Sequence, residues 1–141
     1  MPDFSYCKLE IFVPASHFSA VQTALAESDA GHIGAYDQCL SYSPVTSFWR
    51  PLAGTHPYLG AENTLCQAEE FKVEVTCRTE QVDEIIQAVK AAHPYEEPVI
   101  NVIPLYRTSF REWCPAEPDG FYDWFRWARC CLSTQPIPCA T

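Results

Sequence analysis

The residues with the clearest chemical potential lie in one short stretch, His93-Pro94-Tyr95-Glu96-Glu97-Pro98. An imidazole followed closely by two carboxylates can ligate a divalent cation or move a proton near neutral pH. His93, Glu96 and Glu97 are therefore the candidate catalytic residues. The stretch is also typical of a stiff connector, because its first proline stops a helix and its second favours an extended chain. This structural interpretation is favoured over the chemical one.

Further imidazoles widen the set of candidate ligands. His32 stands between two glycines, where it could bind a ligand or equally hydrogen-bond the adjacent loop, and His56 lies in a long loop. The candidate metal ligands are His93, Glu96, His56 and His32, a mixture that suits zinc or copper better than magnesium. Because imidazole binds metal only when neutral, affinity should fall below about pH 6.5. The candidate ligand-binding residues are His32, Tyr36, Arg50, His56, Tyr58 and Tyr95.

An internal repeat indicates the elements that must position these residues. Lys8-Leu9-Glu10-Ile11 matches Lys72-Val73-Glu74-Val75, which begins 64 residues later. Both segments alternate polar and apolar side chains, as half-buried strands do. Cys7 and Cys77 continue the apolar faces of these strands, so we expect both thiols to be buried as small hydrophobic groups.

A helix and a further strand are expected after each copy of the repeat. Apolar residues recur at helical spacing, with Ser16 and Thr79 as N-caps and Pro94 at the end of the second helix. With right-handed crossovers, this order predicts an α+β ferredoxin-like βαββαβ sandwich, in which two helices cover one face of an antiparallel sheet. The expected helices span residues 16–30 and 80–92, and the expected strands that follow them span 39–49 and 99–106.

This topology separates the candidate residues into two groups. The loop between the second and third strands and the exit of the second helix should lie at one end of the sheet. His56, Tyr58 and the 93–98 stretch are therefore expected to share that end. His32 and Cys39 are expected at the opposite end, where they can meet the first group only across a subunit interface.

Several linked motifs resemble one known family. They are, in chain order, Gly31-His32-Ile33-Gly34-Ala35-Tyr36, Cys39, Phe48-Trp49-Arg50-Pro51-Leu52, Gly54-Thr55-His56-Pro57-Tyr58-Leu59-Gly60 and His93-Pro94-Tyr95-Glu96-Glu97-Pro98. Together they resemble the YqfO-type domain that is inserted in members of the GTP cyclohydrolase 1 type 2-like dimetal family. That domain is similar in fold to the PII and CutA proteins.

The resemblance implies a PII/CutA-like fold and a homo-oligomer, expected here to be a dimer or trimer. Residues 41–69 are similar in position to the ligand-responsive loop of PII proteins. The family holds its two metals in flanking halves that have no counterpart in this sequence. We therefore expect a standalone domain without the dimetal hydrolase chemistry.

Composition narrows the class of function further. The 141 residues are 48% hydrophobic, and nine Lys and Arg against eighteen Asp and Glu give a net charge of −9. This charge disfavours nucleic acid as a partner. A membrane partner is also disfavoured, because no apolar run reaches the ~20 residues that cross a bilayer. Since residues 1–5 lack the features of a signal peptide, we expect a cytoplasmic protein with reduced thiols.

The chain is expected to divide into a PII/CutA-like YqfO-type domain at residues 1–106 and a C-terminal extension at residues 107–141. Within the extension, residues 119–132 place aromatic side chains at helical spacing, which favours a helix docked on the protein's own sheet. The extension also carries four cysteines, which could be ordinary thiols or a metal site.

Three functions agree with these features. The leading hypothesis is an oligomeric binding or regulatory module for a metal ion or small molecule. An alternative is a small enzyme, for example one of secondary metabolism, that uses His93 with Glu96 or Glu97 as an acid–base pair or metal site. A third is a structural domain that binds a partner.

Overall fold

Two strands with strict apolar–polar alternation form the centre of the sheet. In this computed structural model, which describes residues 4–110, β1 (Tyr6–Pro14) pairs antiparallel with β3 (Cys66–Arg78). The register places Leu9 opposite Val75 and Ile11 opposite Val73, so that apolar side chains share one face. The repeat detected in the sequence is therefore a pair of neighbouring strands.

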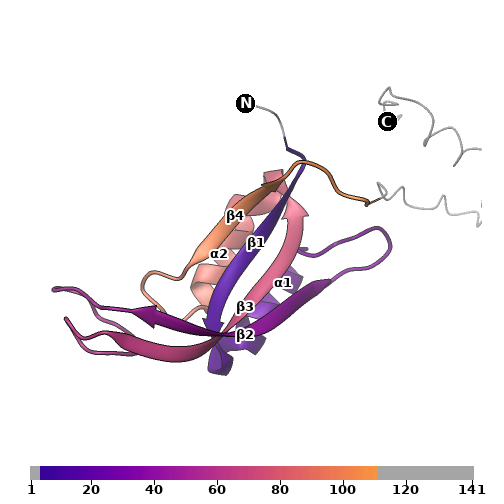
Figure 1. Cartoon of the computed structure of the whole chain (residues 1–141). Coiled ribbons are helices and arrows are strands. Elements are labelled where there is room, and N and C mark those ends of the chain that lie inside the picture. The colour runs from indigo at the N-terminus through magenta and orange to yellow at the C-terminus, as the bar shows by residue number, and fades with distance from the viewer. Residues whose placement is uncertain (1–3, 111–141) are drawn as a thin grey trace, which may run out of the picture.

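Two outer strands complete a four-stranded sheet in the order β2-β3-β1-β4 (Figure 1). β2 (Leu40–Trp49) pairs antiparallel with β3, and β4 (Ile100–Leu105) pairs antiparallel with β1. This order and the two crossover helices confirm the ferredoxin-like fold expected from the sequence. The predicted strands differ from the observed ones mainly at the start of β3, which begins earlier than the repeat indicated.

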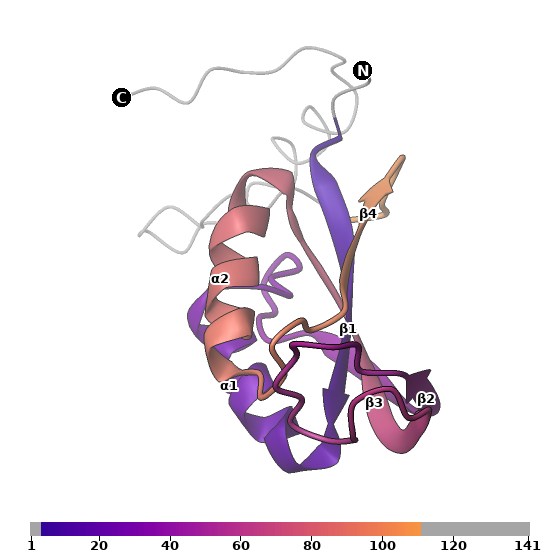
Figure 2. The ribbon, with the colours of Figure 1, turned by 90° about the vertical axis from the view of Figure 1, so that its left-hand side faces the viewer.

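Two helices pack on one face of this sheet, as the edge view in Figure 2 shows. α1 (Phe18–Glu27) follows β1 and α2 (Val82–Ala92) follows β3, each after a single 3-10 turn. The two turns, η1 (Ala15–His17) and η2 (Thr79–Gln81), connect strand to helix.

The expected N-caps of the helices are wrong. Ser16 lies inside the first 3-10 turn, and its hydroxyl contacts His17 Nδ1 rather than a backbone N–H of the helix. Thr79 begins the second 3-10 turn, and its hydroxyl donates to the carbonyl oxygen of Phe4. In both cases the 3-10 turn moves the start of the α-helix two or three residues beyond the expected cap. The first helix is also shorter than expected, because Asp29 adopts a positive φ of 55° and ends the helical path.

The core lies between the sheet and the helices. Leu9 and Ile11 of β1 pack with Val21 and Leu25 of α1 and with Ile85 of α2, and each is 0–1% exposed. Full burial of such a side chain stabilises the fold by about 1.5–3 kcal/mol. Cys7 and Cys77, both 4% exposed and directly opposite each other in the ladder, lie in the same core. The expectation that these thiols are buried is confirmed.

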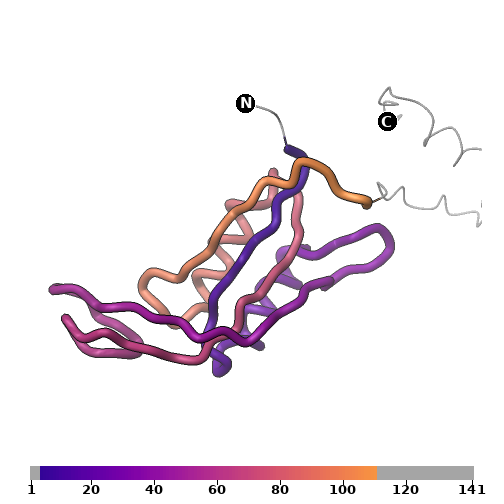
Figure 3. The backbone as a smooth tube through the Cα atoms, viewed as in Figure 1, coloured from indigo at the N-terminus to yellow at the C-terminus, as the bar shows by residue number. Residues whose placement is uncertain are grey.

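β2 and β3 continue past the central part of the sheet as a two-stranded ribbon, which the tube in Figure 3 makes clear. β1 pairs with residues 70–78 of β3, whereas residues 66–69 pair only with β2. The connection between the two strands, residues 50–65, therefore lies at the far end of this ribbon.

The sheet face away from the helices carries charges on the two central strands. Lys8 Nζ lies 2.8 Å from Glu74 Oε1 and 3.6 Å from Glu10 Oε1. This arrangement holds the pKa of Lys8 above its ordinary value, chiefly through the hydrogen bond to Glu74.

Among residues 4–110, no helix is long and apolar enough to span a membrane. The expected helix at 119–132 and the four cysteines of the extension lie outside the described residues.

Candidate functional site

Two segments far apart in the sequence meet at one end of the sheet. The connection between β2 and β3 and the segment from α2 to β4 lie together there, as Figure 2 shows. A hydrogen bond joins them directly, because the backbone N–H of His56 donates to Glu96 Oε2 at 2.9 Å. The structure thus brings His56 and Tyr58 to the 93–98 stretch, as the topology predicted.

A pocket of about 410 Å³ opens between these segments. This volume is in the range of small-molecule sites. Its wall is largely aromatic and apolar, and three carboxylates interrupt it. The lining residues are Phe12, Ser47, Phe48, Trp49, Pro51, Thr55, Pro57, Tyr58, Leu59, Glu70, Tyr95, Glu96, Glu97 and Val99.

Tyr95 stands at the centre of the aromatic wall. Its ring centroid lies 5.9 Å from that of Trp49 and 6.0 Å from that of Tyr58, with interplanar angles of 44° and 41°. The Trp49 indole is held from the other side, since its Nε1–H donates to the carbonyl oxygen of Leu59 at 3.2 Å. Rings fixed in this way present faces and edges to the pocket without collapsing into it.

A buried carboxylate holds the Tyr95 hydroxyl. The O–H donates to Glu70 Oε1 at 2.6 Å, and Glu70 is only 4% exposed. Burial first, and then the acceptor Glu70, raise the pKa of Tyr95 well above its ordinary value. Tyr95 therefore stays a phenol throughout the physiological range and acts as a hydrogen-bond donor.

His93 lies behind the pocket and is tied to the backbone at both ring nitrogens. Nε2 lies 2.7 Å from the carbonyl oxygen of Phe12, and the backbone N–H of Tyr95 donates to Nδ1 at 3.2 Å. One nitrogen must donate and the other accept, so this geometry requires the neutral imidazole with its proton on Nε2. Burial lowers the pKa of His93, in agreement with that tautomer. The imidazole can serve as a base or ligand only by giving up one of these contacts.

The remaining candidates at this end are exposed. The His56 side chain is 90% exposed, and its Nδ1 lies 3.6 Å from Glu96 Oε1. Glu97 lines the pocket, and Arg50 follows the lining residue Trp49 without lining the pocket itself. Their assignment as site residues stays a prediction.

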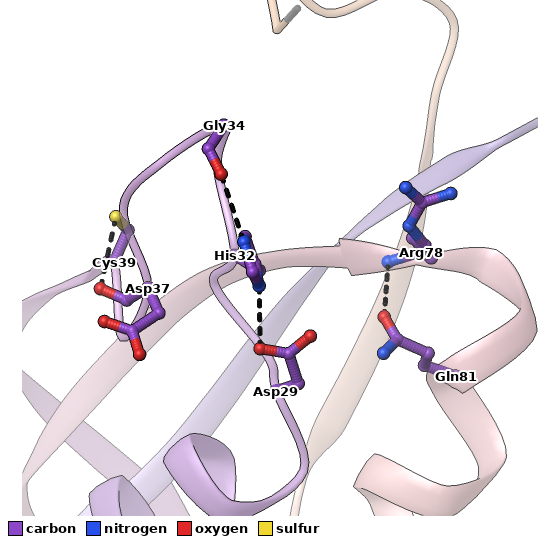
Figure 4. Close-up of polar contacts among 7 residues, drawn as sticks. All are labelled: Asp29, His32, Gly34, Asp37, Cys39, Arg78 and Gln81. Carbon is purple, nitrogen blue, oxygen red and sulfur yellow. Dashed lines mark hydrogen bonds and ion pairs between the residues drawn. The ribbon is translucent and has the colours of Figure 1, made fainter. Parts of the chain in front are cut away.

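The opposite end of the sheet holds His32. Its Nδ1 lies 2.9 Å from Asp29 Oδ1, and its Nε2 lies 3.0 Å from the carbonyl oxygen of Gly34 (Figure 4). Two acceptors are best satisfied by an imidazolium, which donates from both nitrogens. The pKa of His32 is accordingly raised, mainly by the hydrogen bond to Asp29. His32 thus fastens the turn between α1 and β2, and Tyr36 is exposed in the same turn.

Gly31 lets this turn lie against β2. It has a φ of +80°, and a Cβ built there would lie 2.3 Å from the carbonyl oxygen of Cys39. Glycine is therefore required here by both the positive φ and the close backbone approach. A smaller pocket of about 260 Å³ adjoins the turn, with Asp29, His32 and Arg78 in its wall.

The four candidate metal ligands do not meet within one chain. Only His56 and Glu96 are in contact, His93 is committed to the backbone, and His32 lies at the other end of the sheet. Within residues 4–110, no group of three or more His, Cys, Asp or Glu side chains is arranged to hold a metal ion. The residues of a single described chain therefore do not fit a zinc or copper site.

Phe12 and Glu70 are two of the pocket residues that sequence reasoning missed. Phe12 carried a usable signal, because it is an apolar aromatic residue on the face of the first strand that also carries Lys8 and Glu10. The alternation places Glu70 on the charged face of its strand and the neighbour Glu69 on the other face, but it does not show that Glu70 is buried. Only the tertiary packing shows which of these two carboxylates is buried.

Comparisons with known proteins agree with this fold. A family model described as CutA1 divalent ion tolerance protein matches residues 54–117. A GTP cyclohydrolase 1 type 2 homolog of Halalkalibacterium halodurans is 39% identical over 101 residues, which are 72% of this chain and 27% of that relative. The chain thus spans about a quarter of the length of the curated relatives that it matches.

Solved structures give the same relationship. A Bacillus cereus protein related to NIF3 superposes with a TM-score of 0.65 at 32% identity, over 76% of this chain and 27% of its own. The periplasmic divalent cation tolerance protein CutA from Archaeoglobus fulgidus superposes with a TM-score of 0.55 at 26% identity, over 73% and 86% of the two chains. The chain therefore carries a PII/CutA-like domain of the YqfO type, related to the matching quarter of the GTP cyclohydrolase 1 type 2 homologues.

Proposed function

We propose that this protein is an oligomeric binding or regulatory module that holds a small organic molecule in the aromatic pocket. The observation that carries the proposal is the pocket itself, which has about 410 Å³ of space and a wall of fixed rings with a few polar groups. This is the usual composition of a small-molecule site. A cytoplasmic dimer or trimer is part of the proposal, and light scattering on the purified protein tests the assembly.

The position of the pocket supports a regulatory role. Its wall combines residues of the β2–β3 connection with residues of the α2–β4 connection, so a bound molecule contacts both. Occupancy would then favour one arrangement of the β2–β3 connection over others, because a ligand shifts a conformational equilibrium by its differential affinity for the two states. The resemblance of this connection to the ligand-responsive loop of PII proteins agrees with such a role.

A filled pocket tests the proposal. Ser47 lines the pocket, whereas its neighbour Thr46 points to the other face of β2 and bonds to Glu69 Oε1. Fragments that bind the native protein in an NMR screen should lose their binding in Ser47→Trp, because the indole fills the space. Thr46→Trp is the matched control and should leave that binding unchanged. Equal binding by the native protein and Ser47→Trp would place the ligand site elsewhere.

A divalent ion is a second candidate ligand. The names of the CutA relatives refer to divalent cation tolerance, and the His56–Glu96 pair supplies two donors of the right type. Further donors would have to come from a second subunit or from residues outside 4–110. Measuring zinc and copper in protein purified without chelators, with His56→Ala as comparison, tests this candidate. Metal that is retained equally by both proteins would exclude a site at His56.

The enzyme hypothesis receives less support from the geometry. Glu96 and Glu97 reach the pocket, but His93 keeps both ring nitrogens on backbone partners. An acid–base role for His93 therefore requires that one of these hydrogen bonds opens. Acid–base catalysis and the alternative of a structural partner-binding domain both stay predictions.

A further inference from the structure

A buried carboxylate faces the aromatic pocket without a cationic partner among residues 4–110. Glu70 lines the pocket and is 4% exposed, and it accepts a hydrogen bond from the neutral hydroxyl of Tyr95. None of the ion pairs found among residues 4–110 includes Glu70. A charge taken out of water is unfavourable unless an opposite charge compensates it. Glu70 therefore favours a positive group in the pocket.

The other charged residues of the wall also favour a positively charged ligand. Glu96 and Glu97 add two more carboxylates, and no lysine or arginine of the described chain lines the space. Arg50 follows Trp49 in sequence, and Lys72 lies opposite Phe12 in the ladder, but neither is part of the wall. A phosphate or carboxylate ligand would meet only like charges here, so the wall disfavours anions.

The rings supply the second half of a cation site. Trp49, Tyr58 and Tyr95 lie with neighbouring centroids about 6 Å apart, and Phe12 and Phe48 complete the wall. The faces of such rings attract cations, and indole attracts them most strongly. Among the described residues 4–110, a bare metal ion would lack the cluster of donors that it needs, whereas an alkylated ammonium group has both charge and apolar surface to match these rings.

We propose that the ligand of this pocket is a small organic cation, an alkylated ammonium or amine with an apolar body, whose charge is compensated by Glu70. The inference rests on the proposed small-molecule function and specifies its ligand class. Three features of the described wall favour a cation: a buried negative charge, the faces of aromatic rings, and the absence of lysine and arginine side chains.

The test compares two probes of the same shape. Choline carries a trimethylammonium group, and 3,3-dimethylbutan-1-ol replaces its nitrogen with carbon. NMR titrations of the full chain, followed on the backbone amides of Tyr95 and His56, should give at least tenfold tighter binding for choline. Raising the salt concentration should weaken the binding of choline and leave the affinity of the alcohol unchanged, since only the charged probe is screened.

Two isosteric variants test which carboxylate compensates the positive charge of the ligand. In Glu70→Gln the amide oxygen can still accept from Tyr95, so the ratio of the two affinities should fall to about threefold or less. Glu69→Gln removes the neighbouring carboxylate on the opposite face and should leave the ratio unchanged. Should Glu70→Gln fail to fold, Glu97→Gln gives the same test at the pocket rim and should weaken choline about threefold.

The outcomes separate this inference from the proposed function. Equal affinity for the two probes, or fragment hits that are neutral or anionic, would overturn the cationic ligand and leave a small-molecule site in place. A pocket that binds neither probe nor any fragment would overturn the proposed function itself.

Discussion

Replacing His93 with alanine tests whether the most reactive-looking residue of the sequence is structural. The imidazole is 7% exposed and bridges Phe12 on β1 to Tyr95 at the start of the α2–β4 connection. His93→Ala removes both contacts and leaves the Phe12 carbonyl oxygen without its donor. We therefore expect the substitution to lower the stability of the fold. We do not expect it to remove a group that contacts the ligand.

The magnitude follows from these contacts. Two hydrogen bonds contribute about 1 kcal/mol each, and an unsatisfied buried carbonyl costs about 1–3 kcal/mol. The free energy of unfolding should fall by about 2–4 kcal/mol, which lowers Tm by about 10–20 °C for a domain of this size. His93→Asn keeps an acceptor near the Nδ1 position and should lose about half as much. His56→Ala, at an exposed side chain, should change stability by less than about 0.5 kcal/mol.

The pH dependence gives an independent check. Burial lowers the pKa of His93 in the folded protein, so the unfolded chain binds a proton near pH 6.5 while the folded one does not. The free energy of unfolding should therefore decrease as pH falls below about 6.5, and this slope should shrink in His93→Ala. Urea titrations from pH 7.5 to 5 measure both effects. A variant as stable as the native protein, with the same slope but without ligand binding, would show that His93 is a site residue instead.

Three further predictions concern other parts of the fold. Gly31→Ala should destabilise the protein by more than about 2 kcal/mol in urea titrations, because it combines a positive φ with a backbone clash. Gly34→Ala, which has a positive φ but open space, should cost only about 1 kcal/mol, and equal costs would contradict the clash. Cys77 should resist iodoacetamide until unfolding, because burial raises the pKa of its thiol to about 11; rapid native labelling would contradict this burial. His32 has a raised pKa, so its contribution to stability should be lost as pH rises from about 6.5 through that pKa, and Asp29→Asn should remove this dependence. An unchanged profile in Asp29→Asn would show that another group titrates.

The sequence predicted most of the fold because the determining signals are local. Alternation in residues 7–13 and 71–77 and matched helical phases identify the strands and helices directly. The ends of the helices were less predictable. Ser16 and Thr79 have the right chemistry for caps, but 3-10 turns place them one turn too early. Such a turn depends on how the helix must approach the sheet, which no local pattern contains.

The candidate site was predicted in part. Topology alone placed His56, Tyr58 and Tyr95 at one end of the sheet, and the structure brings them together. The roles of the histidines could not be read from the sequence, because burial and hydrogen-bond partners distinguish His93 from His32. The His93 ring has one donor and one acceptor as partners and is held neutral. The His32 ring faces two acceptors and is held charged.

The most direct test of the account is to find where a bound molecule lies. With isotopically labelled protein and an NMR fragment screen, the backbone amides that shift on binding locate the site. We predict that the largest shifts fall on Thr55, Leu59 and Tyr95 in the wall of the aromatic pocket. Shifts that instead cluster around His32 and Arg78, at the smaller pocket of the opposite end, would contradict the assignment of the functional site.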